Sequence, residues 1–230
     1  MNTATSSRGV ASRQVFFPTQ PLYFNVRYAP KPDVPDWVQV LCEVDDGKEA
    51  ICTSLSPFDA MLGAVFSSRP EKRYYAIHAS DFDPSVFIAD NSDHLRLSFH
   101  LGWPARDGKL IARRNGSPMT FAITQQVAVP PECRDRIVFT PNQGVLDCVD
   151  RLYESAGLEE YKDDFATVNS WPKARQDSAV AQALRRMGRL APAGTEFNQL
   201  ALYDPASAQW QFVATEPVFN LHRQIYEGSN

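Results

Sequence analysis

The chain has 230 residues, of which 43% are hydrophobic and 22% are charged, and this composition is typical of a globular protein with a sizeable core. Its formal net charge is −4, which argues against general binding to nucleic acid or to an anionic membrane surface, because both reward a basic face. No stretch approaches the roughly 18 consecutive apolar residues of a membrane-spanning helix, so none is expected.

The first 14 residues, MNTATSSRGVASRQ, are rich in Ser and Thr and contain no acidic residue. They lack the apolar stretch of a secretory signal. We interpret residues 1–14 as a disordered tail, because so polar a segment cannot bury enough surface to order itself. Targeting segments share this lack of acidic residues, so an export leader is the alternative. A single domain is expected over residues 15–230.

Two strands are expected early in this domain. Residues 22–28 alternate apolar and polar side chains close to two prolines, which favours an edge strand. The segment WVQVLCEV (37–44) alternates in the same way and predicts a second strand.

A hairpin is predicted where the second strand reaches Asp45-Asp46-Gly47. A three-residue loop, closed by the glycine in a left-handed conformation, is the preferred interpretation. This register places Cys42 opposite Ala50 and turns Cys52 to the same apolar face. A two-residue loop is the alternative, and it would place Cys42 opposite Ile51.

A helix is predicted over about residues 57–66. Ser56 can cap its N-terminus, Pro57 suits the first turn, and Asp59 follows three residues after the cap. A strand over 73–79 (RYYAIHA) should return to the sheet, and β-structure is expected throughout 81–130. Within that range HLRLSFHL (94–101) alternates strictly, and Asn115-Gly116 indicates a tight turn.

The pattern becomes helical over about residues 141–191, where three amphipathic segments follow one another, the first closed by Gly157. QLALY and QWQFV then flank the turn DPASA, which predicts a second hairpin. The fold class is therefore α+β: an antiparallel-rich sheet, one short helix in the N-terminal half, and a helical segment at 141–191 that could form a subdomain.

One catalytic hypothesis rests on Cys52, with His78 as its base and Asp81 or Asp83 as the orienting carboxylate. A nucleophilic cysteine needs a base within hydrogen-bond reach and often lies near a helix N-terminus, and a helix starts four residues after Cys52. The favoured hairpin register instead packs Cys52 among apolar side chains. We therefore prefer to interpret it as a structural thiol.

No cofactor or metal site is predicted. The four cysteines are scattered, form no CxxC pair, and none lies at ligand spacing from a histidine. Glycine-rich phosphate-binding patterns are absent, as are GxSxG and HExxH. Free thiols without a disulfide framework favour a cytoplasmic protein.

The charge pattern of the helical segment is its most distinctive polar feature. The second predicted helix is acidic and the third is basic, so the two could pair within one chain. Alternatively, they form a bipolar surface for a protein partner, where charge determines specificity and association rate. The residues proposed to bind a partner are Glu159, Glu160, Asp163, Asp164, Arg185, Arg186 and Arg189.

These observations predict a bacterial, cytoplasmic protein–protein interaction module, such as an immunity protein or a secretion adaptor or chaperone. An enzyme that uses Cys52 and His78 as a hydrolase or transferase is one alternative. A secreted effector with an N-terminal export leader is another. The basic helix lacks the interleaved aromatic residues and motifs of nucleic-acid binding, and no oligomeric state follows from the sequence.

Overall fold

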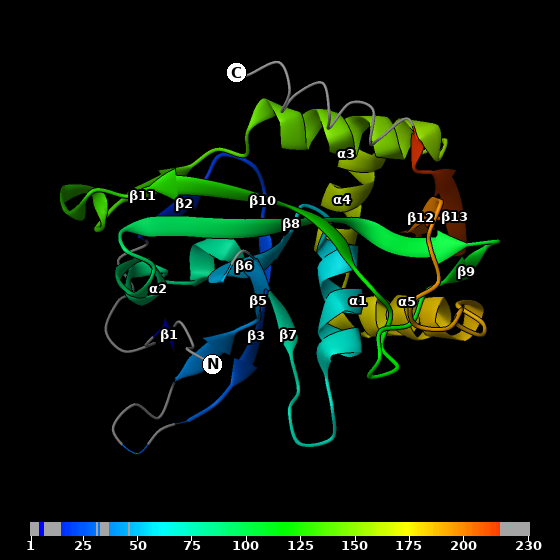
Figure 1. Ribbon diagram of the computed structural model, residues 1–230, viewed down its shortest axis with the longest axis horizontal. Helices are drawn as coiled ribbons and strands as arrows, with labels where there is room; N and C mark the ends of the chain where they lie inside the picture. The colour runs from blue at the N-terminus through cyan, green and yellow to red at the C-terminus, as the bar shows by residue number, and fades with distance from the viewer. Residues whose placement is uncertain (1–4, 7–14, 31, 33–36, 46, 217–230) are drawn as a thin grey trace. The chain divides into compact units, whose positions relative to one another are not determined.

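The computed structural model describes residues 5–6, 15–30, 32, 37–45 and 47–216. It confirms an α+β fold with a mixed sheet and, among these residues, five α-helices (Figure 1). The chain divides into two compact units, Met1–His100 with Ile123–Pro141, and Leu101–Ala122 with Asn142–Asn230. Strand β8 (His94–Arg106) contributes its first part to the first unit and its remainder to the second. Of the predicted tail 1–14, only β1 (Thr5–Ser6) is described, paired with β4, and the rest lies outside the described residues.

Strand β3 (Tyr23–Tyr28) lies inside the sheet of the first unit, so the prediction of an edge strand was wrong. It pairs antiparallel with β7 (Tyr75–His78), and also with both β4 (Val38–Val40) and β6 (Lys48–Ser54). The two prolines that suggested an edge, Pro18 and Pro21, precede β3 and remove none of its N–H groups.

The predicted strand 37–44 is interrupted at Leu41, between β4 and β5 (Cys42–Asp45). The Leu41 N–H donates to the Asn25 carbonyl of β3 at 2.7 Å, and its carbonyl accepts from the Cys52 N–H of β6 at 2.9 Å. Strands β3 and β6 therefore separate at this point. Before Leu41 the chain pairs with β3 as strand β4, and after Leu41 it pairs with β6 as strand β5. We call this branch point the Leu41 fork.

The hairpin register is the alternative one, so the preferred three-residue loop was wrong. Cys42 lies opposite Ile51 and Asp45 opposite Lys48, which leaves two residues in the loop, with Gly47 at φ +73°. The fork explains the difference, because its bond from Cys52 to Leu41 already sets this register before the turn is reached. Cys42 and Cys52 consequently face opposite sides of the β5–β6 ladder.

Helix α1 (Pro57–Ser67) begins as predicted, with the Ser56 hydroxyl accepting a hydrogen bond from the Asp59 N–H at 3.1 Å. It packs against β3 at Gly63, where an added Cβ would lie 2.9 Å from Asn25 Nδ2. The region 81–130 is not β throughout. It contains α2 (Ser85–Asp90), which is too short for its periodicity to show in the sequence.

Aromatic side chains fill the core of the first unit. Phe16, on β2 (Phe16–Pro18), contacts Phe24 and Phe139, and Phe139 also stacks on Phe99. Strand β2 pairs in parallel with β11 (Ile137–Phe139). The remaining short elements are η1 (Ala79–Asp81) and η2 (Pro131–Cys133), and β10 (Phe121–Ala128) pairs with β8.

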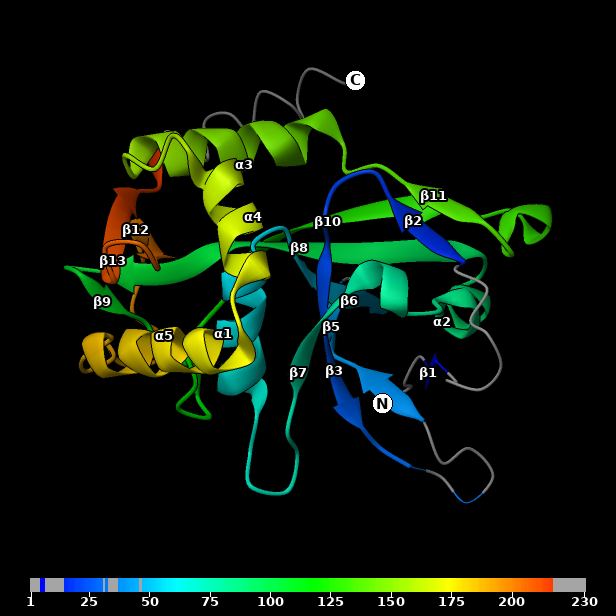
Figure 2. The ribbon, with the colours of Figure 1, turned by 180° about the vertical axis from the view of Figure 1, so that it is seen from behind.

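The second unit contains the helical segment and the second predicted hairpin, both confirmed. The helices are α3 (Gln143–Ser155), α4 (Tyr161–Ser170) and α5 (Lys173–Arg186), with α4 running between the other two (Figure 2). Strand β12 (Gln199–Asp204) pairs with β8 on one side and β13 (Gln209–Ala214) on the other. Strand β9 (Lys109–Leu110) also pairs with β8, and the turn at Gly116 follows it. Helix α5 is fixed against the β12–β13 hairpin by the Trp210 indole, which donates to the Ala183 carbonyl at 3.1 Å.

Candidate functional site

Cys52, His78 and the two candidate carboxylates, Asp81 and Asp83, do not form a site; Asp83 accepts a hydrogen bond from the Ser85 N–H at 2.9 Å. Strand β3 lies between β7 and β6, with Tyr23 opposite His78 on one side and opposite Ser54 on the other. Cys52 is two residues from Ser54 along β6. Ordinary strand spacing separates the Cys52 and His78 Cα atoms by about 12 Å. His78 instead contacts the Ser80 hydroxyl at 2.6 Å through Nδ1, and Asp81 is exposed in η1.

Cys52 lies on a polar face of the sheet, and not among apolar side chains as predicted. It is half-buried and lies opposite Ser98, whose hydroxyl donates a hydrogen bond to the Glu43 carboxylate. The same face carries Asn25 and Arg96, which are 6% and 8% exposed. A nucleophilic cysteine needs a positively charged or neutral-base partner that favours its thiolate, whereas the Glu43 carboxylate beside Ser98 is negatively charged and disfavours a thiolate on this face. The structure therefore gives the catalytic hypothesis no support.

A separate hollow of about 380 Å³ lies at the rim of the first unit. It is bounded by the β5–β6 hairpin, including Lys48 and Glu49, and by the turn after α2, including Asn91 and Ser92. None of the predicted catalytic residues lines it.

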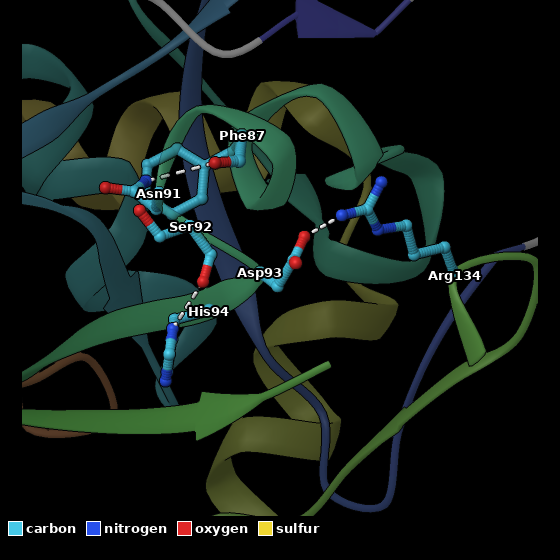
Figure 3. A network of polar contacts seen from close by, with 6 residues as sticks. All are labelled: Phe87, Asn91, Ser92, Asp93, His94 and Arg134. Atoms are coloured by element: carbon cyan, nitrogen blue, oxygen red, sulfur yellow. Dashed lines mark hydrogen bonds and ion pairs between the residues drawn. The ribbon is translucent and has the colours of Figure 1, made fainter. Parts of the chain in front are cut away.

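The turn beside this hollow is strained but well bonded (Figure 3). Ser92 and Asp93 have φ values of +54° and +65°, which side-chain-bearing residues rarely adopt. The Asp93 carboxylate pairs with Arg134, and His94 Nδ1 lies 2.8 Å from the Ser92 carbonyl. These contacts stabilise the strained turn at the edge of the hollow.

The predicted acidic block lies at the start of α4. Glu159, Glu160 and Asp163 are exposed, and Asp164 is half-buried. The one cation in this helix, Lys162, points to α3 and contacts the Asp150 carboxylate at 2.9 Å. Lys162 therefore pairs with α3 and not with the acidic residues of its own helix.

Asp150 joins α3 to α4. Its carboxylate also accepts from the Tyr161 hydroxyl, and Tyr161 packs with Tyr153 and Phe165 at ring distances of 4.4 and 5.1 Å. Burial tends to raise the pKa of Asp150, but the bonds from Tyr161 and Lys162 outweigh it and hold that pKa below its usual range. This cluster fixes the orientation of the acidic helix.

The predicted basic block lies at the other end of the helical segment. Arg185 and Arg186 occupy the last turn of α5, Arg189 follows it, and all three are exposed. The one acidic residue of α5, Asp177, pairs with Lys173 one turn away. The basic end of the helix therefore keeps its full charge.

Two residues at the end of β12, Tyr203 and Asp204, interact electrostatically with the two blocks. Partial burial raises the pKa of Asp164, and the nearby carboxylate of Asp204 raises it further, which places Asp204 beside the acidic block. Burial likewise raises the pKa of Tyr203, while the charges of Arg186 and Arg185 lower it, so the basic block lies beside the preceding residue. Tyr203 and Asp204 are themselves buried, so the charged surface here consists of the two blocks alone, and we call it the bipolar surface. The role of Asp204 could not be predicted from the sequence, because nothing local links it to a helix some 40 residues earlier.

The two blocks do not neutralise each other within the chain. Among the described residues, none of the seven predicted partner-binding side chains forms an ion pair within 4.0 Å. The interpretation in which the helices pair by charge is therefore wrong for this part of the chain. Acidic residues at a helix start and basic residues at a helix end are nevertheless favoured locally by the helix dipole, by about 0.3–1 kcal/mol each.

Within the described ranges, no group of three or more His, Cys, Asp or Glu side chains is arranged to hold a metal ion. No helix in those ranges has the length and apolar character needed to cross a membrane.

Comparisons with models of protein families, with curated proteins and with solved structures found no match to this chain.

Proposed function

We propose that this chain is a protein–protein interaction module whose bipolar surface binds a partner of complementary charge. One observation carries the proposal: the acidic and basic blocks are close to the same strand end, yet their charges are not paired with each other. A partner with a basic patch beside an acidic one would neutralise both blocks at once, and its binding would fix a single orientation.

The mutual repulsion of the acidic residues supports this proposal. Asp164 has a raised pKa partly because three other carboxylates lie near it. A cationic group of a partner would relieve that repulsion, and the energy gained would appear only in the complex. An immunity protein or a secretion adaptor would need no more chemistry than such a surface provides.

The test compares affinity capture from the cells that naturally make the chain, using three tagged forms. The first is the wild type and the second is R185E/R186E/R189E. The third, K72E/K109E/R114E, makes the same change in net charge at other exposed positions. We expect wild type and control to capture one partner and the second form to lose it, with equal urea midpoints for all three, because exposed charges contribute little to stability.

The captured protein is then purified and its affinity measured at increasing ionic strength. Binding through the bipolar surface should weaken as salt rises and should weaken again in E159K/E160K/D163K. Affinity that is indifferent to salt and to both sets of charge reversals would show that the bipolar surface is not the binding surface.

A further inference from the structure

We propose that the outer edge of β13 pairs with β13 of a second copy of this chain, so that one antiparallel sheet continues across a two-fold axis. This inference does not depend on the bipolar surface, because it rests on backbone groups and not on charge.

The hydrogen-bond pattern shows which groups of β13 face outward. The Thr215 N–H donates to the Asn198 carbonyl, so these two residues form a hydrogen-bonded pair. The register continues without a bulge from this pair to Asp204 opposite Gln209. In an antiparallel pair, alternate residues direct both backbone groups to the same neighbour. Gln209, Gln211 and Val213 therefore face β12, and the residues between them face away from it.

The outward-facing residues are Trp210, Phe212 and Ala214. Among the described residues, their outward N–H and C=O groups have no hydrogen-bond partner. Strand β13 also ends the strand order of its sheet. Its outer edge is thus a template for one more strand.

The sequence of β13 has none of the usual protection against such pairing. Exposed edges in monomeric proteins commonly carry a lysine, a proline or a bulge, whereas QWQFVA contains neither a charge nor a proline. The β13 strand of a second copy can therefore pair with this edge without like-charge repulsion.

A second copy fits this edge in a defined register. Antiparallel pairing centred on Phe212 matches outward residues with outward residues: Phe212 with its own copy, and Trp210 with Ala214 of the partner. The small alanine then faces the large indole, and the two phenylalanines form a cross-strand aromatic pair. A single two-fold operation thus satisfies all the outward groups of both strands.

The experiment uses the purified full chain alone, and it combines sedimentation with hydrogen exchange read at single amides by NMR. We expect a concentration-dependent dimer. Protection should rise with concentration at the amides of Trp210, Phe212 and Ala214. The amides of Gln211 and Val213 should be protected at every concentration because β12 already binds them.

Variants at two positions complete the test. Ala214 is exposed: Ala214→Pro removes an outward N–H and should abolish the dimer, whereas Ala214→Thr keeps that N–H and should preserve it. Phe212 faces its own copy across the two-fold axis, so Phe212→Glu places two like charges directly opposite each other and should also abolish the dimer, whereas Phe212→Tyr should preserve it. If Ala214→Pro fails to fold, Phe212→Glu decides. R185E/R186E/R189E should dimerise normally, which separates this inference from the proposed function. A wild-type chain that stays monomeric, or a folded Phe212→Glu chain that dimerises like the wild type, would overturn the proposal.

Discussion

Replacing Gly63 by alanine tests the contact between α1 and β3. Alanine in a helix interior is favoured over glycine by about 1 kcal/mol, so the change would stabilise a helix with free space around it. Here the new Cβ would lie 2.9 Å from Asn25 Nδ2. Asn25 is 6% exposed, so its amide cannot swing into solvent. Overpacking of this kind costs about 1–3 kcal/mol, and we expect Gly63→Ala to lower the free energy of unfolding by about 1 kcal/mol.

A double-mutant cycle isolates the contact, with unfolding in urea followed by circular dichroism. In an Asn25→Ala background the obstructing amide is gone, and the same Gly63→Ala change should raise the free energy of unfolding by about 1 kcal/mol. The expected coupling is therefore about 2 kcal/mol, and the cost of Asn25→Ala itself cancels in the cycle. A coupling near zero would refute the close approach of α1 to Asn25.

Three further changes test charge, strain and thiol exposure. The pKa of Asp164 is raised by burial and by neighbouring carboxylates, so the ionised form of Asp164 destabilises the fold at neutral pH. Asp164→Asn should therefore raise the urea midpoint at pH about 7, but not at pH about 3, which is below the pKa of the unfolded state. An equal gain at both pH values would contradict this cause. Ser92→Gly should add about 0.5–1 kcal/mol to the free energy of unfolding, because glycine adopts the φ of +54° without strain, and a loss of stability would show that the turn is unstrained. Exposed Cys133 should react with a thiol reagent before buried Cys148, whose pKa is raised by burial; a fast phase that persists in Cys133→Ser would belong to another thiol, and if mapped to Cys52 it would revive the catalytic hypothesis.

Features determined by neighbouring residues could be predicted from the sequence. The start of α1 depends on Ser56 and Pro57, and the closing of α3 depends on Gly157, whose φ is +71°. In both places the structure is decided by groups within one turn of the helix.

Features determined by distant segments could not be predicted. The hairpin register follows from the bonds of Leu41 to β3 and β6, and a turn preference worth a fraction of a kcal/mol cannot compete with two strand ladders. Similarly, alternation in β8 correctly separates its two faces, but it does not reveal that polar Arg96 and Ser98 are buried too.

The candidate site was predictable only in part. The charge blocks of α4 and α5 can be identified from composition, but their lack of mutual pairing cannot. That outcome depends on Lys162 turning to Asp150 on α3 and on the position of Asp204 at the end of a later strand.

In most hairpins the length of the loop determines the pairing register of the two strands, but the Leu41 fork makes the register of β5 and β6 independent of the loop. Because Leu41 fixes the pairing of β5 with β6 from the sheet side, the loop at Gly47 has only to connect strands that are already aligned. Residues added at this loop would lengthen an exposed tip without shifting Ile51 or any residue nearer the core. The tip of this hairpin is thus a natural place to insert a tag or a probe.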